Sequence, residues 1–176
     1  PGTYTVNVKV TDSGSPALSA TNAFVVTVNE VNTAPSLAKP LDQTVDELAA
    51  LSLNLVGTDP DLPVQTLTYG LVEGPLGLTV SGAGVVSWTP TEAQGPGTYT
   101  VSVKVTDSGS PALSATNAFV VTVNEVNMVP SLAKPLDQTV DELVALALNL
   151  AGTDGDVPAQ TLTYGLVDGP VGLAVS

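Results

Sequence analysis

An internal repeat of 95 residues constrains this chain more than any other feature of its sequence. Residues 1–81 align without gaps to residues 96–176, and only 12 of the 81 aligned pairs differ. Most differences exchange small, apolar or turn residues, as in Ser52/Ala147 and Pro60/Gly155. A period of this length is that of a whole domain rather than of a small solenoid unit. The sequence therefore predicts an array of similar domains.

The ends of the chain do not coincide with the ends of these units. If a unit begins at the linker proline Pro35, one complete unit spans residues 35–129. Residues 1–34 are then the C-terminal part of a preceding unit, and residues 130–176 are the N-terminal part of a following unit. Together the two partial units lack only a counterpart of residues 82–95. Either the chain is a window on a longer repetitive protein, or neighbouring chains complete each other's units head to tail.

Alternating apolar and polar residues predict short β-strands in the complete unit. The pattern occupies residues 51–55, 65–72, 99–106 and 119–123, with shorter strands expected at 77–81 and 84–88. Glycine and proline fill the gaps between these segments, as turns require. Seven short strands in about 95 residues predict an all-β fold, a tandem array of seven-stranded Greek-key sandwiches of the immunoglobulin (Ig) type. Trp88 is expected in the core, and Tyr99 at a position where such sandwiches often use a buried tyrosine hydroxyl to fix a corner.

The charge of the chain is strongly acidic. Seventeen Asp and Glu residues oppose four Lys, which gives a formal net charge of −13. Such a surface repels nucleic acid and anionic membranes, and it attracts divalent cations. No apolar run approaches the roughly 20 residues that a membrane-spanning helix needs.

Catalysis is not expected from this composition. Histidine and cysteine are both absent, so neither a Ser-His-Asp nor a Cys-His apparatus can form, and zinc has no nitrogen or sulfur ligand. Paired carboxylates can hydrolyse glycosides, but that chemistry needs a cleft with residues that hold the sugar. Trp88 and Tyr69 are instead expected in the core.

The Greek-key topology gathers acidic residues at the two ends of each unit. The connections between the second and third strands and between the sixth and seventh strands share one end. The opposite end carries the start of the second strand, the fifth connection and the exit of the last strand. Each junction should therefore combine carboxylates from one unit, an acidic linker and aspartates from the next unit, which suits calcium and its roughly six to eight oxygen ligands. The candidate ligands, with their counterparts in the partial units, are Asp12, Glu30, Asn32, Glu47, Asp59, Asp61, Glu92, Asp107, Glu125, Asn127, Glu142, Asp154 and Asp156.

The complete unit resembles a bacterial cadherin-like domain, of the dystroglycan-type or putative Ig group, over essentially its whole length. The resemblance implies a calcium-stiffened extracellular domain of large adhesive surface proteins or fibres. By this resemblance Glu47 corresponds to the acidic residue of the first strand, Asp59 and Asp61 to an Asp-x-Asp motif, and Asp107 to an Asp-x-Gly turn. The motifs that carry it are Val45-Asp46-Glu47, Gly57-Thr58-Asp59-Pro60-Asp61, Gly84-Val85-Val86-Ser87-Trp88-Thr89-Pro90, Gly97-Thr98-Tyr99 and Asp107-Ser108-Gly109-Ser110-Pro111-Ala112-Leu113-Ser114-Ala115-Thr116.

Two departures from the cadherin pattern limit the expected number of ions. Cadherins carry Asp-x-Asn-Asp-Asn before the linker proline, whereas this chain has the shorter Glu30-Val31-Asn32-Thr33-Ala34 and Glu125-Val126-Asn127-Met128-Val129. The Leu-Asp-Arg-Glu motif is also absent, and Glu92 is its stand-in. About one or two calcium ions per junction are therefore expected rather than about three.

Plain turn chemistry is the alternative explanation of the acidic residues, because Asp caps backbone N–H groups in turns and acidic loops keep a surface soluble. The favoured function is a structural and adhesive tandem repeat, joined head to tail to its neighbours by calcium in an extracellular stalk or filament at the cell surface. Two alternatives stay open: a module that binds carbohydrate or a cell-surface ligand through an exposed aromatic platform, and a scaffold whose outward Thr and Ser carry O-linked glycans.

Overall fold

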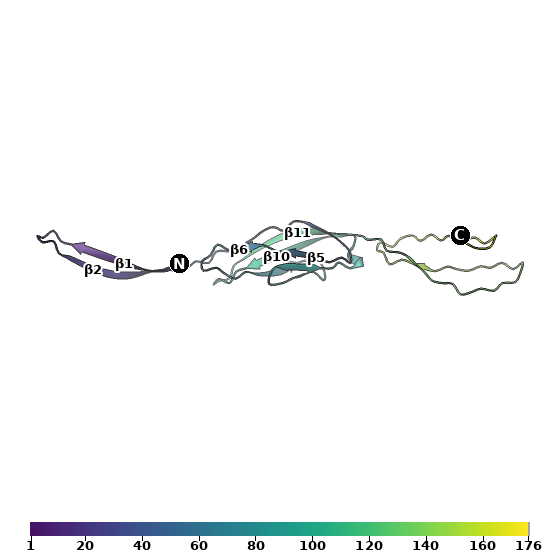
Figure 1. Ribbon diagram of the computed structural model, residues 1–176, viewed down its shortest axis with the longest axis horizontal. Coiled ribbons are helices and arrows are strands. Elements are labelled where there is room, and N and C mark those ends of the chain that lie inside the picture. The colour runs from purple at the N-terminus through teal and green to yellow at the C-terminus, as the bar shows by residue number, and fades with distance from the viewer. Residues whose placement is uncertain (176) are drawn as a thin grey trace.

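The computed structural model describes residues 1–175, and Ser176 lies outside the described residues. The chain is elongated, with three parts in a row (Figure 1). A β-hairpin lies at one end, a β-sandwich lies in the middle, and a C-terminal part with few strands lies at the other end. Among residues 1–175, no helix is long and apolar enough to cross a bilayer.

The N-terminal part is a long antiparallel hairpin of β1 (Gly2–Thr11) and β2 (Ser19–Val28). The strands pair in continuous register from Gly2 opposite Val28 to Thr11 opposite Ser19. Asp12 closes the turn, because its carboxylate accepts hydrogen bonds from the backbone N–H groups of Gly14 (3.0 Å) and Leu18 (2.9 Å). The predicted turn chemistry of aspartate is thus present at this tip.

One sheet of the sandwich has four strands in the order β4-β11-β10-β7. Its members are β4 (Gln43–Asp46), β11 (Ser114–Asn124), β10 (Gly97–Thr106) and β7 (Thr68–Glu73). β10 and β11 repeat the register of the N-terminal hairpin, and β7 pairs antiparallel with β10. β4 runs parallel to β11, which brings the residues after both strands to the same end of the sandwich.

The facing sheet contains β5 (Leu51–Asn54), β9 (Val85–Trp88) and β8 (Thr79–Val80), with β9 in the centre. A short antiparallel pair joins β3 (Ser36–Leu37), which precedes β4 in the chain, to β6 (Gly57–Thr58), which follows β5. β3 and β4 are the two halves of the first strand, which changes sheets, and β5 and β6 are the two halves of the second. The complete unit is thus the seven-stranded Ig-like sandwich that the sequence predicts.

Aliphatic side chains from both sheets fill the core. Val86, Val101, Val103, Val105 and Val121 are fully buried, and Phe119 and Trp88 are almost fully buried. These residues occupy the inward positions of alternating strands, as the period of two requires.

Two aromatic residues fix a corner of the sandwich next to its base, the end at which β11 leaves for the C-terminal part. Trp88 and Tyr99 pack edge to face, with ring centroids 5.2 Å apart. The Trp88 indole N–H donates to the Leu76 carbonyl (3.2 Å), and the Tyr99 hydroxyl donates to the Gln94 carbonyl (2.8 Å). The predicted core position of Trp88 and the predicted corner tyrosine are both confirmed.

The predicted strand at residues 65–72 is wrong at its start. β7 begins at Thr68, because the preceding residues are held in a loop: Gln65 bonds to Asn32 and Asp61, and the Thr66 N–H donates to the Ser108 hydroxyl (3.0 Å). A 3₁₀ helix, η1 (Glu92–Gln94), was not predicted, and a capping box between Thr91 and Gln94 opens it. β11 also begins earlier than predicted, at Ser114.

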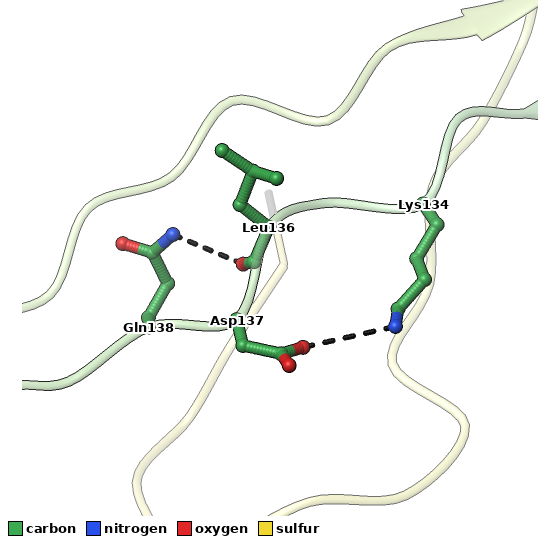
Figure 2. Close-up of polar contacts among 4 residues, drawn as sticks. All are labelled: Lys134, Leu136, Asp137 and Gln138. Carbon is green, nitrogen blue, oxygen red and sulfur yellow. Dashed lines mark hydrogen bonds and ion pairs between the residues drawn. The ribbon is translucent and has the colours of Figure 1, made fainter.

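The C-terminal part has one short pair of strands, β12 (Ser131–Leu132) and β13 (Gly152–Thr153), equivalent to β3 and β6. Its local turns follow the complete unit: Gln138 donates to the Leu136 carbonyl (3.0 Å), as Gln43 donates to the Leu41 carbonyl (Figure 2). Figure 2 also shows an ion pair of Lys134 with Asp137 at 3.8 Å. Both side chains are exposed, so this pair adds little to stability.

Candidate metal centre

Three glutamates meet at the junction between the sandwich and the C-terminal part. Glu47 follows β4, Glu92 begins η1 and Glu125 follows β11. One ligand oxygen from each lies within 4.8 Å of the others. The parallel pairing of β4 with β11 brings Glu47 and Glu125 to the same end, and the corner fixed by Tyr99 presents Glu92 beside them.

The loop that follows β13 in the next unit closes this junction from the other side. The Asp156 carboxylate, which is 4% exposed, accepts hydrogen bonds from the backbone N–H of Met128 at 3.0 and 3.1 Å. The Asp156 N–H in turn donates to the Asp154 carboxylate (3.0 Å). Gln160 bonds through its amide N–H₂ to both Asp156 (2.7 Å) and Asn127 (2.6 Å). These contacts hold the linker against the top of the next unit.

Two further contacts tie the base of the sandwich to the linker and to the next unit. One Glu47 oxygen accepts a hydrogen bond from the Val126 N–H (3.0 Å). One Glu92 oxygen accepts a hydrogen bond from the Val157 N–H (3.0 Å), across the whole junction. The base, the linker and the next unit therefore meet around a single group of carboxylates.

Four carboxylate oxygens in this group are buried and accept no hydrogen bond from residues 1–175. They are the second oxygens of Glu47 and Glu92 and both oxygens of Glu125. Burying an ionised carboxylate without a donor or a counter-ion is costly. An arrangement of unpaired oxygens from several carboxylates is the donor set that a hard divalent cation takes. The residues present therefore fit a calcium ion.

The pKa of Glu125 reflects its burial among these carboxylates. Burial raises the pKa of this carboxyl, and the negative charges of Glu47, Glu92 and Asp156 raise it further. A carboxyl group whose neighbours are all carboxylates resists ionisation unless a cation is present. The Glu125 carboxylate therefore interacts with negative charges of both units.

The junction before the sandwich shows the equivalent half of this arrangement. The Thr33 N–H donates to Asp61 (2.8 Å), and the Asp61 N–H donates to Asp59 (2.9 Å). Gln65 again bridges the linker asparagine, Asn32, and the second aspartate of the pair. Each of these contacts has its counterpart 95 residues later, so the two junctions are built from the same contacts.

Asp107 adds a further carboxylate to this end of the sandwich. It is 5% exposed, and one of its oxygens accepts a hydrogen bond from the Asn32 amide (3.1 Å). Its other oxygen caps the turn through the N–H groups of Gly109 (3.0 Å) and Leu113 (2.9 Å). Burial raises the pKa of Asp107, but these hydrogen bonds outweigh it and hold the pKa below the ordinary value. Asp107 therefore combines the turn chemistry and the junction position that the sequence predicts.

Three predicted ligands join no group of carboxylates among the described residues. Glu30 is exposed in the first linker, and Glu142 is exposed in the C-terminal part. The carboxylate of Asp12 caps its own turn, and the N–H groups of Leu18 and Gly14 lower its pKa. A role in metal binding for these three residues stays a prediction.

Several residues that shape the junctions were missed at the sequence level. Gln65 and Gln160 clamp the linker asparagines, although their loops differ at Leu62/Val157 and Val64/Ala159. The glutamine is the same in both repeats although the loop around it varies, and this was the available signal of its role.

Two glycines were also missed. A Cβ atom added at Gly95 would collide with the Glu47 carboxylate, and one added at Gly109 would collide with the Asn32 side chain. Both positions need glycine because a junction side chain lies directly against the backbone.

Comparisons with known proteins agree with this architecture. The family model described as "Putative Ig domain" matches residues 34–124. Mouse protocadherin Fat 4 is 31% identical over 168 residues, which is 89% of this chain and 3% of Fat 4. Mouse cadherin-23 is 27% identical over 187 residues, which is 96% of this chain and 6% of cadherin-23. The chain thus spans a small fraction of these relatives.

Solved structures show the same fold. The chain matches the EC22-24 fragment of mouse cadherin-23 with a TM-score of 0.59 and 23% identity, covering 74% of this chain and 45% of that one. It matches the EC1-4 fragment of Drosophila N-cadherin with a TM-score of 0.57 and 22% identity, covering 70% and 32%. A bacterial origin stays a prediction. From the family model and the sandwich topology together, the chain belongs to the putative Ig domain family, with cadherin-like repeats in tandem.

Proposed function

We propose that this chain forms part of an extracellular adhesive array of Ig-like repeats whose junctions are stiffened by calcium. The observation that carries the proposal is the meeting of Glu47, Glu92 and Glu125 around four buried oxygens without donors. This proposal covers the metal ligands, the contacts at the junction and the partner of each repeat together, because the carboxylates belong to adjoining units.

Calcium would join three segments of the chain, namely the base of one unit, the linker and the top of the next unit. Its roughly six to eight oxygen ligands lie about 2.3–2.6 Å from the ion. Glu47 and Glu92 would supply ligands from the base of one unit, and Glu125 would supply them from the linker. Asp154 and Asp156 would supply them from the next unit. An ion held by all three segments resists bending between the units, so it would turn a flexible chain into a rod.

Without a cation the same residues would loosen the junction. Carboxylates within a few ångströms repel one another, and after burial, which is the larger cause, this repulsion raises the pKa of Glu125. The free energy that calcium supplies on binding would therefore appear as rigidity at the linker rather than as stability of the sandwich core.

The adhesive and extracellular parts of the proposal are supported by the similarity to protocadherin Fat 4 and cadherin-23. The boundaries at residues 35 and 129 are supported by the repeated linker contacts at the two junctions. Neighbouring repeats, head to tail, are the partners that the geometry favours. No enzymatic activity is proposed for a chain without histidine or cysteine.

Carbohydrate binding has less support. An aromatic platform would have to lie exposed on a sheet of the sandwich, yet Trp88 is 3% exposed and packs against Tyr99. Tyr69 is also partly buried, and its hydroxyl accepts a hydrogen bond from the Gly57 N–H (2.8 Å). O-linked glycans on the outward Thr and Ser side chains stay a prediction.

Hydrogen exchange at the linker tests the proposal. The backbone N–H groups of Val126 and Met128 donate to Glu47 and Asp156, so calcium that fixes those carboxylates should slow their exchange at least about tenfold. The core amide of Val103 serves as the internal reference. Magnesium, which keeps its waters, should protect the linker much less. Linker exchange that is the same with about 5 mM calcium and with chelator would contradict the proposal.

A further inference from the structure

We propose that the side-chain amide of Gln65, and that of Gln160 at the next junction, occupies the place that a second cation would take between the linker asparagine and the second aspartate of the Asp-x-Asp pair. The junction after the sandwich would then hold one ion, at the group of Glu47, Glu92 and Glu125. The inference rests on the proposed function for that one ion only, and it identifies the residue that limits the number of ions.

Oxygen atoms from the linker and from the loop after β6 converge at the Gln65 amide. Its nitrogen donates to the side-chain oxygen of Asn32, in the linker, and to the carboxylate of Asp61 (2.9 Å), in the loop. The two N–H groups of this amide thus face an amide oxygen and a carboxylate oxygen, which are the kinds of ligand atom that calcium takes. The nitrogen therefore lies where an ion bound to the same two oxygens would lie.

Groups that only accept hydrogen bonds fix the orientation of both amides. The Asn32 nitrogen faces the Asp107 carboxylate (3.1 Å) and the Pro111 carbonyl (2.8 Å), and neither group donates when the carboxylate is ionised. The Asn32 oxygen must therefore face Gln65, and Gln65 must present its nitrogen. Since calcium takes oxygen ligands, the nitrogens beside Asp61 and Asp107 exclude an ion from this side of the junction.

The Gln65 oxygen adds support, because it is buried and accepts no hydrogen bond from residues 1–175. An unpaired buried acceptor is costly. Turning the amide over would nevertheless place this oxygen against the oxygens of Asn32 and Asp61. The two bonds from the nitrogen therefore outweigh the unpaired oxygen.

The carboxylates of Asp61 and Asp107 are satisfied without a cation. Burial raises the pKa of Asp107, but hydrogen bonds from two backbone N–H groups of its turn and from Asn32 outweigh it and hold the pKa below the ordinary value. Asp61 accepts bonds from the linker backbone and from Gln65. The glutamate group differs, because four of its oxygens have no donor among the described residues and the pKa of Glu125 is raised, first by burial and then by like charges.

The second junction repeats the bridge. The Gln160 nitrogen donates to the Asn127 oxygen (2.6 Å) and to the Asp156 carboxylate (2.7 Å). An ionised carboxylate has about four acceptor sites, so Asp156 can keep this bond and still face an ion at the glutamates. Asp59 has one buried oxygen without a donor, and this residue, like its equivalent Asp154, stays available to the ion of a glutamate group. The amide therefore closes only the asparagine side of each junction.

Gln65→Glu tests the inference, because it replaces the donating amide with a carboxylate. At neutral pH its oxygens would face those of Asn32 and Asp61, and a cation is needed to hold that group together. Equilibrium dialysis against up to about 10 mM calcium should find about one more bound ion per chain than in the unsubstituted protein. Asn54→Asp adds the same charge at the exposed end of β5 and should leave the number of ions unchanged. Gln160→Glu repeats the test at the second junction.

Hydrogen exchange of the Thr33 N–H, which donates to Asp61, is the second readout. In chelator this exchange should be at least about tenfold faster in Gln65→Glu than in the unsubstituted chain, and calcium should slow it again. The emission of the single tryptophan, Trp88, reports that the sandwich stays folded. An unchanged number of bound ions in both Gln65→Glu and Gln160→Glu, with the sandwich folded, would overturn the inference.

The side-chain amide hydrogens of Gln65 and Gln160 separate this inference from the proposed function. In the unsubstituted chain they should stay protected from exchange when calcium is added. Loss of their protection would show that the ion displaces the amides, which overturns the inference and leaves calcium binding intact. An unsubstituted chain that binds no calcium contradicts the proposed function instead, whereas a calcium site that appears only in Gln65→Glu would still support an amide in the place of an ion.

Discussion

The Glu92 carboxylate accepts a hydrogen bond from the backbone N–H of Val157, 3.0 Å away and 65 residues later in the chain. This contact joins the base of one Ig-like unit directly to the top of the next. The other Glu92 oxygen is buried and accepts no bond from residues 1–175. Glu92 thus links two units with one oxygen and leaves the other free for a cation.

Replacing Glu92 with alanine should weaken calcium binding at least about tenfold, because the junction loses both a ligand and its bridge to Val157. Isothermal titration calorimetry measures the change. Glu73→Ala removes the same charge from an exposed position at the end of β7 and should leave the affinity unchanged. Equal losses in the two variants would point to a general charge effect and contradict the assignment of Glu92.

Lowering the pH should tighten the metal-free junction. Burial first, and then the charges of Glu47, Glu92 and Asp156, raise the pKa of Glu125 above the ordinary 4.5. For an acid with a raised folded-state pKa, the stabilisation is fully present below the unfolded value and is lost as the pH rises through the folded value. Linker hydrogen exchange, corrected for its intrinsic pH dependence, should therefore show a junction that loosens in chelator as the pH rises above about 4.5 and through the raised pKa of Glu125.

Glu125→Gln should remove this pH dependence, because its amide does not ionise. In the unsubstituted chain, calcium affinity should move in the opposite direction and fall as the pH falls, since the ion requires the ionised carboxylate. A metal-free junction that loosens on acidification would show that the crowding of carboxylates at Glu125 is not the dominant force there.

Gly95→Ala should impair calcium binding without unfolding the core. The added Cβ atom would collide with the Glu47 carboxylate, so that side chain must leave its place. Gly70→Ala is the matched control, because a Cβ atom there meets only the Lys104 side chain at ordinary contact distance, 3.5 Å. Calorimetry and the melting temperature of both variants separate the two effects. Unchanged affinity in Gly95→Ala would contradict the placement of Glu47.

Tyr99→Phe should destabilise the sandwich by about 1 kcal/mol, the usual value of one partly buried hydrogen bond. The Tyr99 hydroxyl bonds to the Gln94 carbonyl at 2.8 Å and so fixes η1, which carries Glu92. The equivalent residue of the hairpin, Tyr4, is 55% exposed, and Tyr4→Phe should change nothing. Urea unfolding followed by Trp88 fluorescence measures both. Equal effects of the two substitutions would contradict the corner role of Tyr99.

Much of the fold was predictable because its strands alternate strictly. Val101, Val103 and Val105 occupy every second position, and a period of two places all three in the core. The loop around Gln65 was not predictable in the same way. Its sequence continues the strand pattern of residues 65–72, and contacts with Asn32, Asp61 and Ser108, which that pattern does not show, hold it out of the sheet.

The candidate metal centre was likewise predictable only in part. Greek-key topology alone brings Glu47, Glu92 and Glu125 to one end, so the group could be predicted from the positions of loops. The clamps of Gln65 and Gln160 and the close approaches at Gly95 and Gly109 depend on backbone paths that no residue pattern specifies.

The most direct test of calcium stiffening at the junction is a calcium titration of the 176-residue chain. Calorimetry measures the binding, and small-angle X-ray scattering measures the shape. We expect saturable binding of about one or two ions with a dissociation constant of about 10⁻⁴–10⁻³ M, as in extracellular calcium modules. The maximum dimension should increase on binding and return to its first value with chelator. Scattering that does not change, together with no saturable heat up to about 10 mM calcium, would contradict it. The junction acids would then serve turns and solubility alone.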